Sequence, residues 1–298
     1  FEFNLISPSV LDYSVIDGTE PAESMLTVNE YIAEDYWSAV NGSSLPENLQ
    51  GVRSRADEIS EKYGVRILLS SQCLPACTFA EYPTTTTDQM DLADEAASIN
   101  AAFDSLEEAL SLYPEGFFPQ FRSEFGDGGI RIMLVGGFES NFNMIGYSVQ
   151  NSLWHNIYVD IFSEGLVGTY CHEIWHATED HITSINYGEF DVVQWAELNP
   201  DGFQYIFDPA ESILNEGDYT YFGSTKPKDC YFIDGYAKTN EREDRARIME
   251  YAMTGFFGSE LSEYPHLYAK LRYMSDKIRQ YFDTTGWSTP RWEDALGE

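Results

Sequence analysis

The segment that most constrains this chain runs from residue 171 to 181 and reads CHEIWHATEDH. Its two histidines, His172 and His176, are four residues apart, so on a helix their imidazoles lie on one face and can converge on a single tetrahedral Zn²⁺. Glu173 lies next to such an ion without ligating it and can take a proton from zinc-bound water. The fold must therefore place a helix here and bring a third ligand to it, because a catalytic zinc keeps three protein ligands and one open position.

The third ligand has to come from outside this helix. A third histidine at the spacing of the metzincin motif would be residue 182, but Ile182 stands there. Three acidic residues downstream are the candidates, since carboxylates are common ligands in catalytic zinc sites: Glu197, Asp218 and Glu243. Glu243 is favoured because it falls in the first turn of a predicted helix and can project from a rigid element into the site.

Residues 235–243 read GYAKTNERE. Together with the HExxH motif, this segment resembles the protease domain of lethal-factor-type toxins, in which a Tyr, a Thr-Asn-Glu run and a ligand Glu open a helix. It also resembles the wider set of gluzincin-type bacterial extracellular zinc metallopeptidases. The resemblance implies that Glu243 is the third zinc ligand and that Tyr236 lies over the metal, its hydroxyl aimed at the developing oxyanion. The chain departs from the toxins at Trp175, where they have Gly, and at 244–246, where Asp-Arg-Ala replaces an aromatic pair.

Hydrophobic periodicity predicts an α+β fold, because the order of elements is unlike a regular βαβ alternation. The predicted helices are 47–63, 88–113, 165–181, 241–256 and 261–282, and the predicted strands are 65–70, 130–137 and 156–162. With the resemblance, this order predicts a zincin-like metallopeptidase domain over 46–298, built from a small mixed sheet, an active-site helix and C-terminal helices. Strand 156–162 is expected at the sheet edge, where an extended substrate can pair beside the metal.

The chain is strongly acidic. It has 17 Lys and Arg against 50 Asp and Glu, a formal net charge of −33, which disfavours binding to nucleic acid or to acidic lipid headgroups. Two interpretations stay open: a surface that keeps an exported protein soluble, or an acidic cleft that favours cationic or neutral substrates. Glu179, Asp180 and His181 lie one to two turns past the ligands; an acid there could hold the Nδ1–H of a ligand histidine, but a solvated helix end is the favoured interpretation. Residues 1–45 contain no basic residue and are expected to form an acidic N-terminal lead-in or linker.

No apolar run approaches the ~20 residues of a membrane-spanning helix, so no membrane insertion is expected. The chain starts at Phe1 without a signal-type segment, from which we expect an extracellular or cell-surface protein whose signal sequence has been removed. Cys73 and Cys77 are close enough for a short disulfide, whereas Cys171 is expected as a buried free thiol. A Cys₂His₂ zinc site that uses the first two cysteines is disfavoured, because it would leave Glu173 without a purpose.

These features together predict a zinc-dependent endopeptidase that acts on a peptide or protein substrate. His172, His176 and Glu243 hold Zn²⁺, Glu173 deprotonates the bound water, and Tyr236 helps to stabilise the oxyanion. Two alternatives stay open. One is a non-catalytic surface binding or adhesion domain on a zincin scaffold, and the other is a zinc amidase that acts on cell-wall peptides.

Overall fold

The computed structural model describes most of the chain from residue 47 onward. The chain divides into two compact units, Phe1–Pro46 and Glu47–Glu298, and every element described below belongs to the second. The described residues are 45, 47–73, 82–123, 126–139, 144–151, 153–185, 190, 192–208, 222 and 228–297. The predicted lead-in over 1–45 therefore lies outside the described residues, apart from residue 45.

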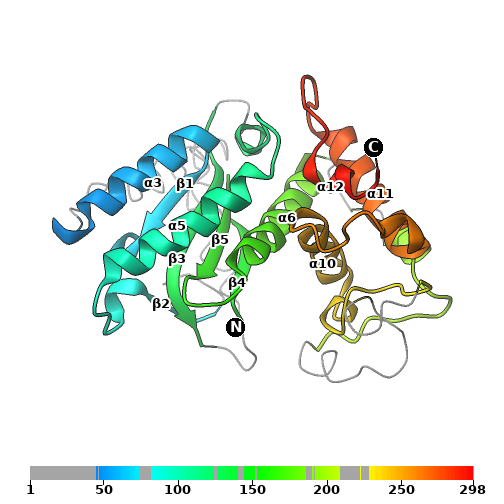
Figure 1. Cartoon of the computed structure of the whole chain (residues 1–298), viewed down its shortest axis with the longest axis horizontal. Coiled ribbons are helices and arrows are strands. Elements are labelled where there is room, and N and C mark those ends of the chain that lie inside the picture. Colours follow the sequence, from blue (N-terminus) through cyan, green and yellow to red (C-terminus); the bar gives the residue numbers. More distant parts are fainter. Residues whose placement is uncertain are drawn as a thin grey trace, which may run out of the picture. The chain divides into compact units, whose positions relative to one another are not determined.

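A five-stranded mixed sheet forms the first layer of this unit (Figure 1). Its path runs β1–β3–β5–β4, and β2 pairs with β3 outside that path. β3 pairs parallel with β1 and β5, whereas β4 pairs antiparallel with β5. The strands are β1 (Arg66–Leu69), β2 (Thr84–Thr86), β3 (Gly129–Phe138), β4 (Gly146–Asn151) and β5 (Trp154–Asp160). The predicted α+β class and small mixed sheet are confirmed.

The predicted position of strand 156–162 is wrong. This segment corresponds to β5, which lies inside the sheet between β3 and β4 rather than at its edge. The outer strand on this side of the described sheet is β4, which the sequence analysis did not identify. Its residues read GYSVQN, a short, half-polar run that starts with Gly and contains only two apolar residues, Tyr147 and Val149, in alternation with polar ones. A strand at the edge of a sheet pairs with only one other strand, so its sequence shows a weaker hydrophobic pattern.

Two groups of helices flank the strand layer. In Figure 1, α3 and α5 run across the front of the sheet, and α5 contacts both α3 and α6. The C-terminal helices α10, α11 and α12 form the second group and contact one another. The longer helices are α3 (Gln50–Tyr63), α5 (Glu95–Ser111), α6 (Leu166–Ile185), α10 (Glu241–Met253) and α11 (Pro265–Tyr281). The short ones are α7 (Val192–Ala196), α12 (Arg291–Asp294), η3 (Glu47–Leu49), η4 (Ser70–Cys73), η5 (Thr87–Gln89), η6 (Phe118–Phe121), η7 (Tyr236–Lys238) and η8 (Leu261–Glu263).

Helix α6 lies between the sheet and the C-terminal helices. It packs on β4 and β5 on one side and on α10 and α11 on the other, and Figure 1 shows it in this central place. Its residues Cys171, Ile174 and Trp175 are buried, and Cys171 is a free thiol, as expected. The proposed disulfide partner Cys77 lies outside the described residues. A helix buried on both sides is a rigid support for the two histidines it carries.

The predicted helices are observed with shifted ends. α5 starts at Glu95 rather than at residue 88, because the Asp94 side chain accepts a hydrogen bond from the Ala97 amide and caps the helix there. α3 ends where predicted, at Gly64, whose φ of 76° lies in the left-handed region that glycine favours. Within the described residues, no helix has both the length and the apolar character needed to cross a bilayer.

A cluster of aromatic rings packs the far end of α6 against the sheet. The ring of His155, from β5, lies 5.8 Å from that of His181 on α6, and both rings contact Phe121. Burial, with His181 nearby, lowers the pKa of His155 to about 3, and burial lowers the pKa of His181 to about 4. Both imidazoles are therefore neutral in the folded protein at neutral pH.

We predict that these two histidines make the fold acid-sensitive. In the unfolded chain they take up protons below pH ~6.5, whereas the folded protein cannot, so stability is lost as pH falls from 6.5 toward 4. Each histidine contributes up to about 1.4 kcal/mol per pH unit. His155→Phe should therefore reduce the stability lost between pH 7.5 and 5.0 by roughly 2 kcal/mol, as measured by urea unfolding at both pH values. His266→Phe, at a less buried histidine, is the control, and an equal change in both variants would contradict the prediction.

Candidate metal centre

Helix α6 presents the two motif histidines toward α10. Their Nε2 atoms lie 3.2 Å apart, and their ring planes stand at 78° to one another. Both side chains are buried, with about a tenth of their surface exposed. Trp175, which departs from the toxin pattern, is 1% exposed and packs edge-on against Phe190. It therefore fills the core behind the histidines and does not occupy the space between them.

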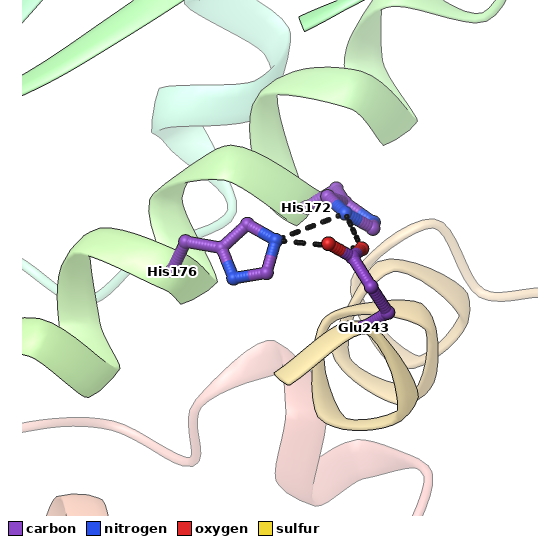
Figure 2. Close-up of side chains that lie close together, drawn as sticks. All are labelled: His172, His176 and Glu243. Atoms are coloured by element: carbon purple, nitrogen blue, oxygen red, sulfur yellow. Dashed lines mark hydrogen bonds and ion pairs between the residues drawn. The ribbon is translucent and has the colours of Figure 1, made fainter. Parts of the chain in front are cut away.

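Glu243 meets the histidines from the first turn of α10. The side chain of Asn240 accepts hydrogen bonds from the amides of Arg242 and Glu243 and so starts the helix at this point. Oε2 of Glu243 lies 3.0 Å from Nε2 of His172 and 3.6 Å from Nε2 of His176. Figure 2 shows the carboxylate pointing from α10 toward both imidazoles. The structure thus brings the three predicted ligands together.

These three residues form a donor set that fits a divalent metal ion. Their ligand atoms all lie within 4.8 Å of one another, and among the described residues they make the one such group of histidines, cysteines and acids. Two imidazoles and one carboxylate are a common protein ligand set of catalytic zinc. The group is largely buried, so a bound ion would be accessible to water only at the position that the three ligands leave open.

Of the rival third ligands, Glu197 alone lies among the described residues, and it does not join this group. Glu197 is exposed in the turn after α7, and it is absent from the cluster that forms around His172. Asp218 and Cys77 lie outside the described residues.

The pKa shifts of these side chains favour a positive charge between them. Burial alone would lower the pKa of His172, but hydrogen bonds with Glu243 and Glu250 outweigh it and raise that pKa to about 10. Burial alone would raise the pKa of Glu243, but His176 and His172 hold it well below its usual value. A positive charge between these side chains is therefore stabilised, because they are largely buried and the carboxylates of Glu243 and Glu250 both face His172.

Glu173 is a buried acid without a full set of partners. It is 4% exposed, and its Oε2 atom has no hydrogen-bond partner among the described residues. Burial raises the pKa of Glu173 to about 7. A carboxyl group in this state can both accept and return a proton near neutral pH, as a general base requires. Leaving such a group buried and unpaired costs stability, which points to a functional use.

Tyr236 lies beside the same group. It starts η7, and its ring centre is 6.2 Å from that of His172. Burial raises the pKa of its phenol well above the usual value, and the nearby carboxylates of Glu243 and Glu173 raise it further. The hydroxyl therefore stays protonated and remains a hydrogen-bond donor beside the candidate site.

A buried ion pair fastens α10 to α6 next to the ligands. Arg245 donates from Nε and Nη2 to the two carboxylate oxygens of Glu179, at 3.0 and 2.5 Å. Arg242 lies 2.7 Å from Asp180. The interpretation of Glu179 and Asp180 as a solvated helix end is therefore wrong: Glu179 is 3% exposed, and both acids bind arginines of α10. Arg245 is one of the residues that replace the aromatic pair of the toxins.

The neighbour on the other side of Glu243 is anchored as well. Asp244 accepts from Nζ of Lys270 at 2.7 Å and from the hydroxyl of Tyr205 at 2.9 Å. Lys270 also donates to the Tyr231 carbonyl at 2.8 Å, and the side chains of Lys270 and Asp244 are fully buried. Residues 242, 244 and 245 thus each hold a partner outside α10, which fixes the rotation of the helix and the direction of Glu243.

The sequence analysis missed Glu250, whose Oε2 lies 3.3 Å from Nδ1 of His172. A signal was present, because Glu250 is seven residues after Glu243 and two helical turns bring it to the same face of α10. The presence of several other acids in this helix obscured that signal.

Comparison of the chain with protein-family models, with curated proteins and with solved structures found no match.

We predict that Arg245 matters for stability mainly because it neutralises Glu179. Arg245→Met should lower the free energy of unfolding by roughly 3–5 kcal/mol, because it leaves a buried carboxylate unpaired. The double variant Arg245→Met/Glu179→Met should recover most of that loss, since well-packed apolar residues often replace a buried ion pair at little cost. Chemical denaturation of the two single variants and the double variant measures the coupling.

The control is Lys228→Met, which breaks an exposed ion pair with Glu263. It should leave stability unchanged within error. A double variant that is as unstable as the sum of the two single variants would contradict the prediction.

Proposed function

We propose that this chain is a zinc-dependent endopeptidase of the gluzincin type with a zincin-like fold. The observation that carries the proposal is the convergence of His172, His176 and Glu243 within 4.8 Å, with Glu173 buried beside them. The α+β architecture with α6 against a mixed sheet is consistent with that fold. When bound, zinc would supply a Lewis acid that activates water and polarises the scissile carbonyl group.

The protein's own groups supply the proton transfers and the positioning. Glu173 takes a proton from the attacking water and returns it to the leaving amine, a role supported by its burial and by a pKa raised toward neutrality. Tyr236 donates its hydroxyl hydrogen to the carbonyl oxygen as negative charge develops there. His172, His176 and Glu243 hold the ion, and the pairs of Arg242, Asp244 and Arg245 keep α10 in register with α6.

Strand β4 is proposed as the platform for the substrate. It is the outer strand of the described sheet, it packs on α6, and its first residue, Gly146, lies against Glu173. An extended peptide can add to such an edge through main-chain hydrogen bonds. This corrects the earlier expectation, which gave the role to 156–162, and it keeps the substrate on the side of the sheet next to the candidate base.

Among the alternatives, a non-catalytic binding domain is disfavoured by Glu173, because a buried carboxylate with one oxygen unpaired among the described residues costs stability, and binding alone has no use for it. A zinc amidase of cell-wall peptides would use the same chemistry. The edge of β4 favours a substrate with extended peptide on both sides of the cleaved bond, which is the endopeptidase case. The proposal includes an extracellular or cell-surface setting and a peptide or protein partner; the net charge of −33 disfavours nucleic acid.

The first test is Glu173→Gln. This variant keeps the size of the side chain and all three ligands but removes the base. Bound zinc, measured by elemental analysis, should stay at the wild-type level, while hydrolysis of a mixed peptide library should fall about 10²- to 10⁴-fold. Wild-type turnover in this variant would end the proposed mechanism.

Two further variants define the ligand set in the same assays. Glu243→Gln should lose zinc as well as activity, because it removes the charged third ligand. Glu197→Gln is the matched control, since it changes an exposed acid that lies outside the cluster. It should alter neither zinc content nor turnover.

The second test concerns the contact between β4 and the base. A Cβ atom at Gly146 would lie 3.0 Å from Oε1 of Glu173 and 3.0 Å from Cγ2 of Thr169. Gly146→Ala should therefore displace the Glu173 carboxylate and lower kcat by roughly 10- to 100-fold, with zinc content unchanged. Gly51→Ala, on α3 where the added methyl meets nothing within 4 Å, is the control. Equal activity of the two variants would show that the position of Glu173 does not depend on β4.

A further inference from the structure

His172 is held at both of its ring nitrogens. Nε2 lies 3.0 Å from Glu243, on the side of the candidate metal, and Nδ1 lies 3.3 Å from Oε2 of Glu250 on the opposite side. The two acids come from the same face of α10, two turns apart. His176 differs, because its Nδ1 atom is buried and no described residue forms a hydrogen bond with it. Among the described residues, only His172 therefore has a partner at the ring nitrogen that faces away from the candidate metal.

Glu250 is itself fixed by a chain of charged groups. Its Oε2 atom also pairs with Nη1 of Arg247, one turn earlier on α10. Arg247 in turn donates from Nε and Nη2 to Oδ2 of Asp234, at 2.9 and 2.5 Å. Oδ1 of Asp234 accepts from the amide of Ala237, in the turn that carries Tyr236. All three charged side chains are at least three-quarters buried, so solvent competes little for these contacts.

The backbone of α6 leaves room for this arrangement at Gly168. A Cβ atom there would lie 3.0 Å from Oε1 of Glu250 and 3.4 Å from its Cγ. Glycine inside a helix costs about 1 kcal/mol relative to alanine, so its presence has to be compensated. Here the missing side chain lets the carboxylate of Glu250 approach α6, one turn before His172. Glu250, Arg247 and Gly168 thus all contribute to the contact between Glu250 and His172.

We propose that Glu250 is a positioning residue that orients His172 for metal binding. It accepts the Nδ1–H hydrogen, which leaves the Nε2 lone pair directed at the space shared with His176 and Glu243. Arg247 and Asp234 hold the carboxylate in place, and Gly168 admits it. Carboxylates that support a ligand histidine in this way set the tautomer and raise the basicity of the ligand. The inference rests on the metal centre of the proposed function but needs no peptide hydrolysis.

An ion pair with only a structural role would look like the pair of Glu250 with Arg247, but its loss would affect stability and not zinc binding. The chain offers a matched example in Glu293, which is 3% exposed and accepts from Nε and Nη2 of Arg279 at 2.7 and 2.5 Å. It also accepts from the hydroxyl of Ser275 at 2.6 Å. This pair joins α11 to α12 and has no contact with the candidate ligands. Loss of Glu293 should therefore cost stability alone.

The experiment compares Glu250→Gln with Glu293→Gln in the full chain. The dissociation constant for Zn²⁺ is measured by competition with a chromophoric chelator, and the melting temperature is measured without metal. Glu250→Gln should bind zinc about 10- to 100-fold more weakly than wild type, and Glu293→Gln should bind it as wild type does even if its melting temperature falls. Wild-type zinc affinity in Glu250→Gln, or an equal loss in both variants, would overturn the proposal.

Gly168→Ala provides a test that removes no polar group and improves helix propensity. It should also weaken zinc binding, because the new methyl group displaces the Glu250 carboxylate, and it should shift the visible absorption bands of the Co²⁺-loaded protein. Unchanged affinity and an unchanged Co²⁺ spectrum would overturn the proposed contact, whether or not Glu250→Gln folds. Because both readouts report metal binding, a wild-type protein that binds zinc tightly but cleaves no peptide would refute the proposed function and leave this inference standing.

Discussion

The contact between α6 and α10 is the constraint on which the rest of the molecule depends. α6 supplies two imidazoles and α10 supplies the carboxylate between them, so the site exists only while the two helices keep their register. Apolar packing alone would tolerate some rotation of α10. The bidentate Arg245–Glu179 pair and the Asp244–Lys270 pair do not, because each leaves a buried charge without a partner if the helix turns. These buried ion pairs therefore fix the rotation of α10 more than they add to the free energy of unfolding.

The sequence predicted the parts of this arrangement that depend on local periodicity. The pair His172 and His176 required a helix, and the long apolar patterns located α5 and α6 to within about two turns. Glu243 was favoured because it falls in the first turn of a predicted helix, and the resemblance of residues 235–243 to the toxin proteases implied the same residue. The edge position of β4 could not be predicted, because strand order depends on pairing between distant segments. The partners of Glu179 and Asp180 were missed for the same reason, since nothing near them in sequence identifies an arginine more than sixty residues away.

The candidate site also gathers more negative charge than its histidines can balance. Glu173, Glu243 and Glu250 all lie beside the histidine pair; Glu173 is buried, and the side chains of Glu243 and Glu250 are 17% and 16% exposed. Arg247 neutralises one of them, and the remaining repulsion would favour protonation or an added cation. This is a local conflict of the kind that folded proteins tolerate where function requires it. A divalent ion resolves it, because it replaces repulsion among the acids with attraction to all of them.

The same helix provides both the direct ligand and the support of a ligand on its neighbour. Because Glu250 follows Glu243 by seven positions, α10 faces His172 with one acid on each side of the imidazole ring. A translation of α10 along its axis would move both acids together. The His172 ring would then move with them, and its contacts with Glu243 and Glu250 would be kept or lost together. The orientation of His172 is therefore coupled to the position of α10 as a whole. That coupling explains why charged anchors occur along the first turns of this helix, where an exposed helix would carry only solvated side chains.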